Sequence, residues 1–159
     1  MEFDLSQLAK FLVKAKTQTY AGDGKEIAAQ RPGFSELEFK EGNFEYRDSY
    51  SGFYQAPGQE VVRYKSKPIW IMAYSGGMEK KYHGDADFSE KTFSFLKQAL
   101  LRIEELRPFR GPDYLKEGDY EYVNKVEGDI ADFSGREQIL YKGEKVFTQD
   151  YIGGLIIQK

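Results

Sequence analysis

KEGNFEY, residues 40–46, returns in this chain as KEGDYEY, residues 116–122. Further on, YSGGM at residues 74–78 is matched by YIGGL at residues 151–155. Matches that recur in the same order at a nearly constant offset, 76 residues at first (40 to 116) and then 77 (74 to 151), indicate an internal tandem duplication. Residues kept in both copies are expected to serve the scaffold. Features present in one copy are better candidates for function.

Each copy is expected to open with a helix. Asp4-Leu5-Ser6-Gln7 and Asp87-Phe88-Ser89-Glu90 match the capping box. In this motif the Asp side chain accepts a hydrogen bond from a free backbone N–H of the first turn, and the Gln or Glu side chain accepts one from the backbone N–H of the Asp. Apolar residues at spacings of three and four then predict a buried stripe on each helix. The stripes are Leu8, Phe11, Leu12 and Ala15 in the first helix, and Leu96, Ala99, Leu100, Ile103 and Leu106 in the second. Because Pro108 disfavours helix continuation, the second helix is expected to end near Arg107.

Aromatic-rich strands are predicted to follow each helix. They cover residues 43–50, 60–65 and 68–74 in the first copy and 119–126, 137–142 and 145–151 in the second. The short links require antiparallel hairpins, because parallel pairs need long crossovers. The sequence therefore predicts an α+β fold in a single domain, residues 1–159, built of two repeats (1–78 and 86–157) with a connector at 79–85. Each repeat is a helix followed by an antiparallel meander of three to four strands.

The final strands of the two copies differ in pattern. Ile69–Ala73 is apolar on both faces, which is typical of a central strand covered on both sides. Val146–Asp150 alternates toward polar residues, so this strand is predicted to lie nearer an edge.

Composition narrows the classes of function. A net charge of −3 without a long basic run argues against nucleic-acid binding, and no apolar run is long enough to span a membrane. The absence of cysteine excludes disulfides, and the single histidine, His83, excludes a multi-histidine metal site. The acidic start, Met1-Glu2-Phe3-Asp4, differs from the basic start of a signal peptide. The sequence predicts a cytoplasmic protein without a metal or cofactor.

The chief asymmetry between the copies precedes Arg31. The helices align at an offset of 84 residues (Phe11 to Phe95) and the strands at 76, so the first copy carries about eight extra residues within Thr17–Gln30. Glycines on both sides of Asp23 would allow a loop that brings backbone N–H groups close to a ligand. The alternative, an ordinary helix C-cap followed by a surface loop, carries more weight.

Charged residues offer further alternatives. His83 with Asp85 nearby could act as a general base, but a lone histidine in a charged connector is more often solvated. Arg31 and Arg107 could bind a carboxylate or phosphate. Because both copies contain this arginine, and both contain a glutamate at the equivalent positions Glu60 and Glu137, a repeated structural ion pair is favoured. The duplicated Gly-Gly pairs at 76–77 and 153–154 are interpreted as turns or bulges, with close backbone approach as the other reason for glycine.

The sequence also resembles a prokaryotic family of uncharacterised domains, found alone and fused behind helix-turn-helix domains in xenobiotic-response-type regulators. The matching stretches are residues 11–16, 19–22, 31–33, 68–74, 110–112 and 151–155. The fusions imply a sensing or dimerising role by analogy. This chain lacks the helix-turn-helix, so the resemblance does not imply DNA binding. Asp23 also stands where the family has a more purely glycine-rich run.

Three hypotheses of different classes follow. The first is a small-molecule-binding module with its pocket between sheet and helices, for which the candidate ligand-binding residues are Tyr20, Gly22, Asp23, Arg31, Trp70 and Tyr74. The second is a structural or interaction protein that acts as a homodimer. The third is an enzyme that uses carboxylate and tyrosine chemistry. No catalytic residue is assigned, because no nucleophile elbow, zinc motif or calcium-loop spacing is present.

Overall fold

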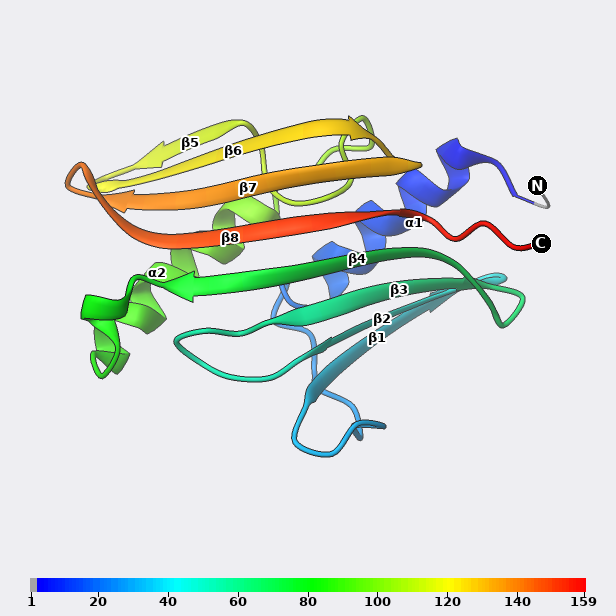
Figure 1. Cartoon of the computed structure of the whole chain (residues 1–159), viewed down its shortest axis with the longest axis horizontal. Coiled ribbons are helices and arrows are strands. Elements are labelled where there is room, and N and C mark those ends of the chain that lie inside the picture. The colour runs from blue at the N-terminus through cyan, green and yellow to red at the C-terminus, as the bar shows by residue number, and fades with distance from the viewer. Residues whose placement is uncertain (1–2) are drawn as a thin grey trace.

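The computed structural model describes residues 3–159. Met1 and Glu2, with which the first predicted repeat begins, lie outside the described residues. The elements in chain order are α1 (Leu5–Gln18), β1 (Ser35–Glu41), β2 (Phe44–Tyr50), β3 (Gly58–Tyr64), β4 (Lys67–Met78), the 3₁₀ helix η1 (Lys80–Tyr82), α2 (Ala86–Leu100), β5 (Tyr114–Glu117), β6 (Tyr120–Asp129), β7 (Asp132–Tyr141) and β8 (Glu144–Leu155). The predicted α+β class is confirmed (Figure 1).

All eight strands form a single antiparallel sheet in the order β1-β2-β3-β4-β8-β7-β6-β5. Each half of the chain is therefore a helix followed by a four-stranded meander, and the two meanders meet where β4 pairs with β8. The strand order is symmetric about this pair, with Tyr74 opposite Tyr151. The antiparallel hairpins are confirmed, while a tandem duplication as their origin stays a prediction.

The prediction that the last strand of the second half lies near an edge is wrong. β8 lies between β4 and β7 at the centre of the sheet. Its polar character comes in part from an uncovered face rather than from an edge, since Asp150 points, with Ile152, to the side that carries no helix and is exposed, while the polar Gln149 is buried on the other side. For the same reason β4 is central but is not covered on both faces, and Ala73 is exposed.

Both helices lie on one face of the sheet, the far side in Figure 1. The predicted stripe of α1 is buried, and it packs in a cluster with Trp70, Met72 and Phe133. The α2 residues Phe95, Leu96, Ala99 and Leu100 are buried in a second cluster with Tyr122, Ile139 and Phe147. The core is thus divided in two, and polar groups occupy the space between the clusters.

The helix ends test the capping predictions. The Asp4 box is confirmed, because Asp4 accepts from the Ser6 N–H at 3.1 Å and Gln7 accepts from the Asp4 N–H at 3.4 Å. The second helix is capped by Asp85, which accepts from the Phe88 N–H at 3.1 Å, so the box predicted at Asp87 is wrong.

The second helix also ends earlier than predicted, at Leu100 rather than near Arg107. The N–H groups of Arg102 and Ile103 turn back to carbonyls three residues earlier, which closes the last turn. This turn buries Ile103 and leaves Leu106 exposed. The helical spacing of apolar residues therefore extends past the end of the helix.

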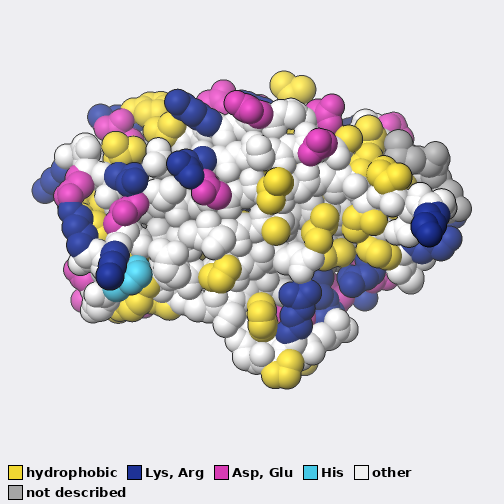
Figure 2. All heavy atoms as spheres, in the orientation of Figure 1, with side chains coloured by type: hydrophobic (Ala, Val, Ile, Leu, Met, Phe, Trp, Pro, Cys, Tyr) yellow, Lys and Arg dark blue, Asp and Glu magenta, His cyan; other side chains and the backbone are white. Residues whose placement is uncertain are grey.

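The face of the sheet that carries no helix is seen in Figure 2, in the same orientation as Figure 1. Hydrophobic side chains appear in its middle, and Ile152 on the central strand β8 is 62% exposed. Neither helix in residues 3–159 has the length and apolar character needed to cross a membrane.

Candidate functional site

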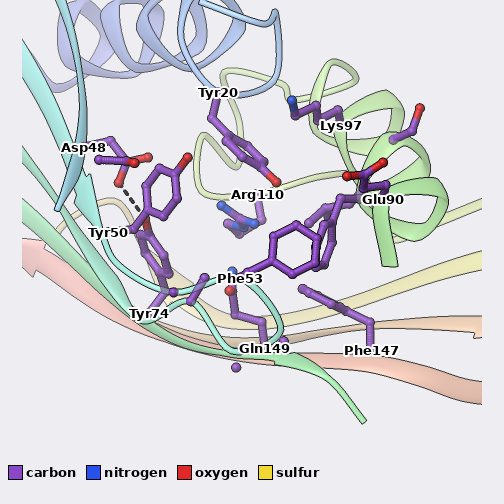
Figure 3. A pocket seen from close by; sticks show the side chains of 18 of the residues that line it. Tyr20, Asp48, Tyr50, Phe53, Tyr74, Glu90, Lys97, Arg110, Phe147 and Gln149 are labelled. Atoms are coloured by element: carbon purple, nitrogen blue, oxygen red, sulfur yellow. Dashed lines mark hydrogen bonds between the residues drawn. The ribbon is translucent and has the colours of Figure 1, made fainter. Parts of the chain in front are cut away.

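A cavity of about 620 Å³ lies on the helix-bearing side of the sheet, between α2 and the segment that follows α1. Six aromatic side chains line it: Tyr20, Tyr50, Phe53, Tyr74, Phe93 and Phe147. Figure 3 shows several of these rings around Arg110 and Gln149, with Asp48 beside Tyr74. The volume falls in the range of roughly 300–1,000 Å³ that is usual for small-molecule sites.

One wall of the cavity is the connection between β2 and β3, residues 51–57. At the equivalent place in the second half, the β6–β7 ladder continues to the pair Asp129 and Asp132. In the first half the chain instead leaves the ladder and turns toward α2. There Phe53 packs edge-on against Phe93, with ring centroids 5.4 Å apart. Tyr54 stacks on His83 at 5.5 Å.

Gly77, the second glycine of the pair in β4, allows this connection to lie against the strand. Gly77 has a φ of +154°, and a Cβ on it would clash with the carbonyl oxygen of Tyr54. The neighbouring Met78 N–H donates to that same oxygen at 2.7 Å. Gly154 of β8 relates to Ala131 in the same way. Both pairs lie inside strands, so the interpretation as turns is wrong and the close backbone approach is the reason for glycine.

The floor of the cavity adjoins a set of buried ionisable groups, which we call the buried charge cluster: Lys16, Asp48, Glu60, Arg110 and Glu137. Lys16 Nζ lies 2.6 Å from Glu60 Oε2, and Arg110 Nη2 lies 2.6 Å from Glu137 Oε1. Arg110 Nε also donates to Glu137 Oε1, at 2.8 Å. Burial lowers the pKa of Lys16, and the Glu60 carboxylate opposes that change.

The sequence predicted a repeated ion pair with Arg31 and Arg107 as the cations, and this choice of cations is wrong. Glu60 and Glu137 are buried and paired, but their partners are Lys16 from α1 and Arg110 from the segment after α2. Arg107 instead pairs with Asp113 near the surface. The Arg31 guanidinium donates to Gln59 at 3.0 Å.

Asp48 is the member of the cluster that lines the cavity without a cation of its own. Its Oδ1 accepts a hydrogen bond from the Tyr74 hydroxyl at 2.6 Å, and the residue is only 4% exposed. Burial and the neighbouring Glu60 raise the pKa of Asp48 to about 7, against the opposing effects of Tyr74, Arg110 and Lys16. A buried, titratable group with a strongly shifted pKa in a cavity is a candidate functional residue.

The other half of the sheet holds a neutral counterpart. Asn124 pairs with Glu137 across β6 and β7 as Asp48 pairs with Glu60 across β2 and β3. Its Oδ1 accepts from the Tyr151 hydroxyl at 2.7 Å, and its Nδ2 donates to the Gly111 carbonyl at 3.0 Å. At this place the fold uses a neutral amide, which accepts the tyrosine hydrogen bond and donates one to a backbone carbonyl.

The mouth of the cavity is formed by α2 and the segment after α1. Lys97 Nζ lies 2.6 Å from Asp23 Oδ1 and 4.9 Å from the centre of the Tyr20 ring. Burial raises the pKa of the Tyr20 hydroxyl to about 12, so this phenol stays neutral. Glu90 lines the same mouth from the preceding turns of α2.

The segment after α1 is a tight turn rather than an open glycine loop. A Cβ on Gly22 would clash with the Thr17 carbonyl, and the Gly24 N–H donates to the Thr19 carbonyl at 2.8 Å. The glycines thus pack on the end of the helix, as the C-cap alternative predicted. Asp23, with a φ of +54°, is the residue that extends to the cavity.

The structure brings together three of the six candidates named from sequence. Tyr20, Asp23 and Tyr74 line the cavity. Gly22 supports the turn behind it, and Arg31 lies elsewhere on the surface. Trp70 is fully buried in the core, where its Nε1 donates to the Ile130 carbonyl at 3.0 Å.

Several cavity residues escaped prediction from sequence. Asp48 and Arg110 carry its charge, and Phe53 and Phe93 belong to its aromatic wall. A signal was present in the sequence, since Asp48 stands at the position that matches Asn124 at the offset of 76 residues. An exchange of charge at matched positions is thus a signal of this residue, as an insertion is of the segment after α1.

The connector residues do not join this site. Asp85 caps α2, and the His83 ring contacts the Met78 carbonyl through Nε2 at 3.0 Å. Neither residue lines the cavity. Within residues 3–159 there is also no group of three or more His, Asp or Glu residues placed to hold a metal ion.

Comparison with known proteins places the chain among relatives of undefined activity. No curated protein and no solved structure matches it. A family model, described as a domain of unknown function, DUF5680, matches residues 48–156. That range runs from Asp48 through β8 and so contains most of the cavity wall. Because the match covers more than half of its length, the chain belongs to the DUF5680 family of domains of unknown function.

Proposed function

We propose that this protein is a small-molecule-binding module, with a sensing role, and that its ligand occupies the cavity between α2 and the sheet. The observation that carries the proposal is the composition of the cavity. Aromatic rings form the wall, and a few polar groups, chiefly Asp48, Arg110 and Gln149, are gathered on the floor. Apolar walls with a small number of placed polar groups are the usual construction of a ligand site.

The asymmetry of the fold supports the same proposal. In the second half the hairpin continues as a ladder, whereas residues 51–57 leave the ladder and enclose space. A connection serving the scaffold alone would have the simpler hairpin available to it. Its departure from that conformation creates one wall of the cavity.

A thermal-shift screen with a blocked variant tests the proposal. Ser94 is an exposed residue of α2 that lines the cavity, so Ser94→Trp should fill the space without disturbing the core. Gln98→Trp, exposed on the same helix outside the cavity, is the matched control. A ligand at about 100 times its Kd should stabilise the chain by about 2.7 kcal/mol. For a domain of this size that is a rise in Tm on the order of 5–10 °C.

The expected pattern separates the two variants. Stabilisation by a compound class should be retained in Gln98→Trp and lost in Ser94→Trp. If no compound class stabilises the wild-type chain, or if stabilisation survives in Ser94→Trp, the ligand does not occupy this cavity.

A second candidate function is self-association through the uncovered face of the sheet. Ile152 is 62% exposed on a central strand, beside the exposed Ala73 of β4. Exposed apolar surface on a central strand is a feature of interaction faces. Light scattering would show a dimer that Ile152→Lys converts to a monomer, and a monomer at high concentration would remove this candidate.

A further inference from the structure

The ionisable groups around the cavity include more carboxyl groups than cations. The buried charge cluster holds three carboxyl groups and two cations. Each cation is already within ion-pair distance of a glutamate, Lys16 with Glu60 and Arg110 with Glu137. The third carboxyl group, Asp48, is left with a tyrosine hydroxyl as its hydrogen-bond donor.

The mouth of the cavity likewise has one more carboxyl group than it has cations. Lys97, the remaining cation of the cavity lining, is paired with Asp23 at 2.6 Å. Glu90 lines the mouth and makes no ion pair with any residue in the range 3–159. After every cation has been matched with its carboxylate, the unmatched charges that face the cavity are both acidic.

The walls favour a positive charge as well. Six aromatic rings surround the space above Asp48. The face of an aromatic ring carries partial negative charge and attracts a cation, and the attraction is stronger where water is excluded. The protein already uses this contact twice at the cavity, with Lys97 over Tyr20 at 4.9 Å and Arg110 over Tyr74 at 5.8 Å.

Asn124 shows that the charge on Asp48 is not a structural requirement. At the equivalent place an amide accepts the equivalent tyrosine hydrogen bond. An unpaired buried carboxylate destabilises a fold unless something compensates it. Among residues 3–159 no cation forms an ion pair with Asp48, and Arg110 and Lys16, which act on it from their own pairs, offset its burial only in part. A cation on the ligand would supply the remaining compensation.

We infer that the ligand is a cationic amine with a flat apolar body, and that the carboxylate of Asp48 is its counter-ion. The amine lies on the floor of the cavity within reach of Asp48, and the apolar body lies among the aromatic rings toward Phe53 and Phe93. This inference rests on the proposed function of the cavity and specifies the class of its ligand.

An anionic ligand is the competing choice, since Arg110 also lines the floor. The contacts of that guanidinium with Glu137 involve both Nε and Nη2, which fix its direction and offset its charge. A ligand carboxylate would add a fourth acid to a cluster with two cations. The electrostatic balance therefore favours the amine.

Three probes of nearly equal shape separate the choices: 2-phenylethylamine, 2-phenylethanol and 3-phenylpropionate. Their affinities are measured by calorimetry at pH 8 on the full wild-type chain and on Asp48→Asn. Glu127→Gln, an exposed carboxylate outside the cavity, controls for the change in net charge. The amine should bind the wild type about tenfold more tightly than the alcohol, as expected for a charge-assisted hydrogen bond, and the propionate should bind least.

In Asp48→Asn the amine should lose about tenfold in affinity and approach the alcohol, whose own affinity stays within about twofold. Glu127→Gln should behave as the wild type. Tighter binding of the propionate than of the alcohol, or an amine preference that survives in Asp48→Asn, would overturn the inference and leave the proposed function standing. If the screen finds no cavity ligand of any class, the proposed function itself fails.

A second measurement uses the wild type alone and so does not depend on the folding of a variant. The groups around Asp48 are Glu60 from β3, Lys16 from α1, Tyr74 from β4 and Arg110 from the segment after α2. The pKa of Asp48 is about 7. Amine affinity should therefore fall as the pH drops from 8 to 6, while alcohol affinity stays constant. Equal pH dependence for the two probes would contradict the assignment of Asp48 as counter-ion.

Discussion

Asp48 and Asn124 receive the same hydrogen bond from a tyrosine and differ in charge. Each tyrosine ring lies over a glycine of the neighbouring strand, Gly58 in the first half and Gly135 in the second, where a Cβ would clash with the ring. The fold thus builds one arrangement twice and places an ionisable group in only one of them. The ionisable group is the one that faces the cavity, as the proposed ligand site expects.

The first prediction at this scale concerns the stability of Asp48→Asn. Folding raises the pKa of Asp48 from 3.8 to about 7, so the folded chain holds this proton more tightly. The associated stability is present at low pH and is lost as the pH rises through this range, by on the order of 4 kcal/mol. Asp48→Asn lacks this loss and should be more stable than the wild type at pH 8.

Urea unfolding at pH 4 and pH 8 measures the effect. The difference between the two chains should be small at pH 4 and should favour the variant at pH 8. A difference independent of pH would show that Asp48 ionises in the folded chain as it does in water.

The second prediction concerns the buried pair of Lys16 and Glu60. Lys16→Met leaves the glutamate buried without its cation and should lower the free energy of unfolding by about 3–5 kcal/mol. Lys14 lies on the same helix as Lys16 and forms an exposed pair with Glu41 of β1. Lys14→Met breaks this pair and should lower the free energy of unfolding by less than about 1 kcal/mol. Similar losses in the two variants, measured in urea, would mean that Lys16 contributes no more than a surface charge.

At the scale of the element, the connection 51–57 is what distinguishes the two meanders. Backbone hydrogen bonds from Met78 to Tyr54 and from Ala56 to Gly76 hold it against β4. The stack of Tyr54 on His83 joins it to the connector before α2. The cavity wall is therefore a separately attached element rather than a continuation of the ladder.

The third prediction uses Gly77, which permits the connection 51–57 to lie against β4, and Gly154, its counterpart in β8. Gly77→Ala clashes with the Tyr54 carbonyl, so the connection 51–57 should detach and ligand affinity should fall. Gly154→Ala clashes with the Ala131 carbonyl and should loosen the β6–β7 hairpin instead. Each strain should cost about 1–3 kcal/mol.

Hydrogen exchange distinguishes these outcomes. The Met78 amide should lose protection in Gly77→Ala, and the Leu155 amide in Gly154→Ala, because these groups donate to the displaced carbonyls. Loss of ligand affinity in Gly154→Ala with retention in Gly77→Ala would contradict the role given to the connection.

For the whole molecule, the sequence predicted the helix-plus-meander halves because capping residues and alternating aromatics act locally. It did not predict that β8 lies at the centre, because the pairing of β4 with β8 joins strands far apart in the chain. The ion-pair partners of Glu60 and Glu137 were wrong for the same reason, since Lys16 and Arg110 reach them only in the assembled fold. Of the site, Tyr20, Asp23 and Tyr74 were accessible from sequence.

The rest of the cavity arises where the two halves and α2 meet. The segment 51–57 is one residue shorter than its counterpart 127–134, so no insertion marks the one that departs from the ladder. The insertion that was visible, before Arg31, contributes Tyr20 and Asp23 to the mouth and little to the floor. The insertion thus marks the mouth of the cavity, and no change of length marks its floor or the wall at 51–57.

Whether a ligand occupies the cavity can be measured by amide chemical-shift mapping on the isotope-labelled chain. Titration with a ligand from the screen should give saturable shifts in residues 51–57, in α2 from Glu90 to Lys97, and at Tyr20 and Asp23. The same titration of Ser94→Trp should give none of these shifts. Saturable shifts confined to the uncovered face around Ile152, or shifts in the cavity residues that persist in Ser94→Trp, would contradict the claim.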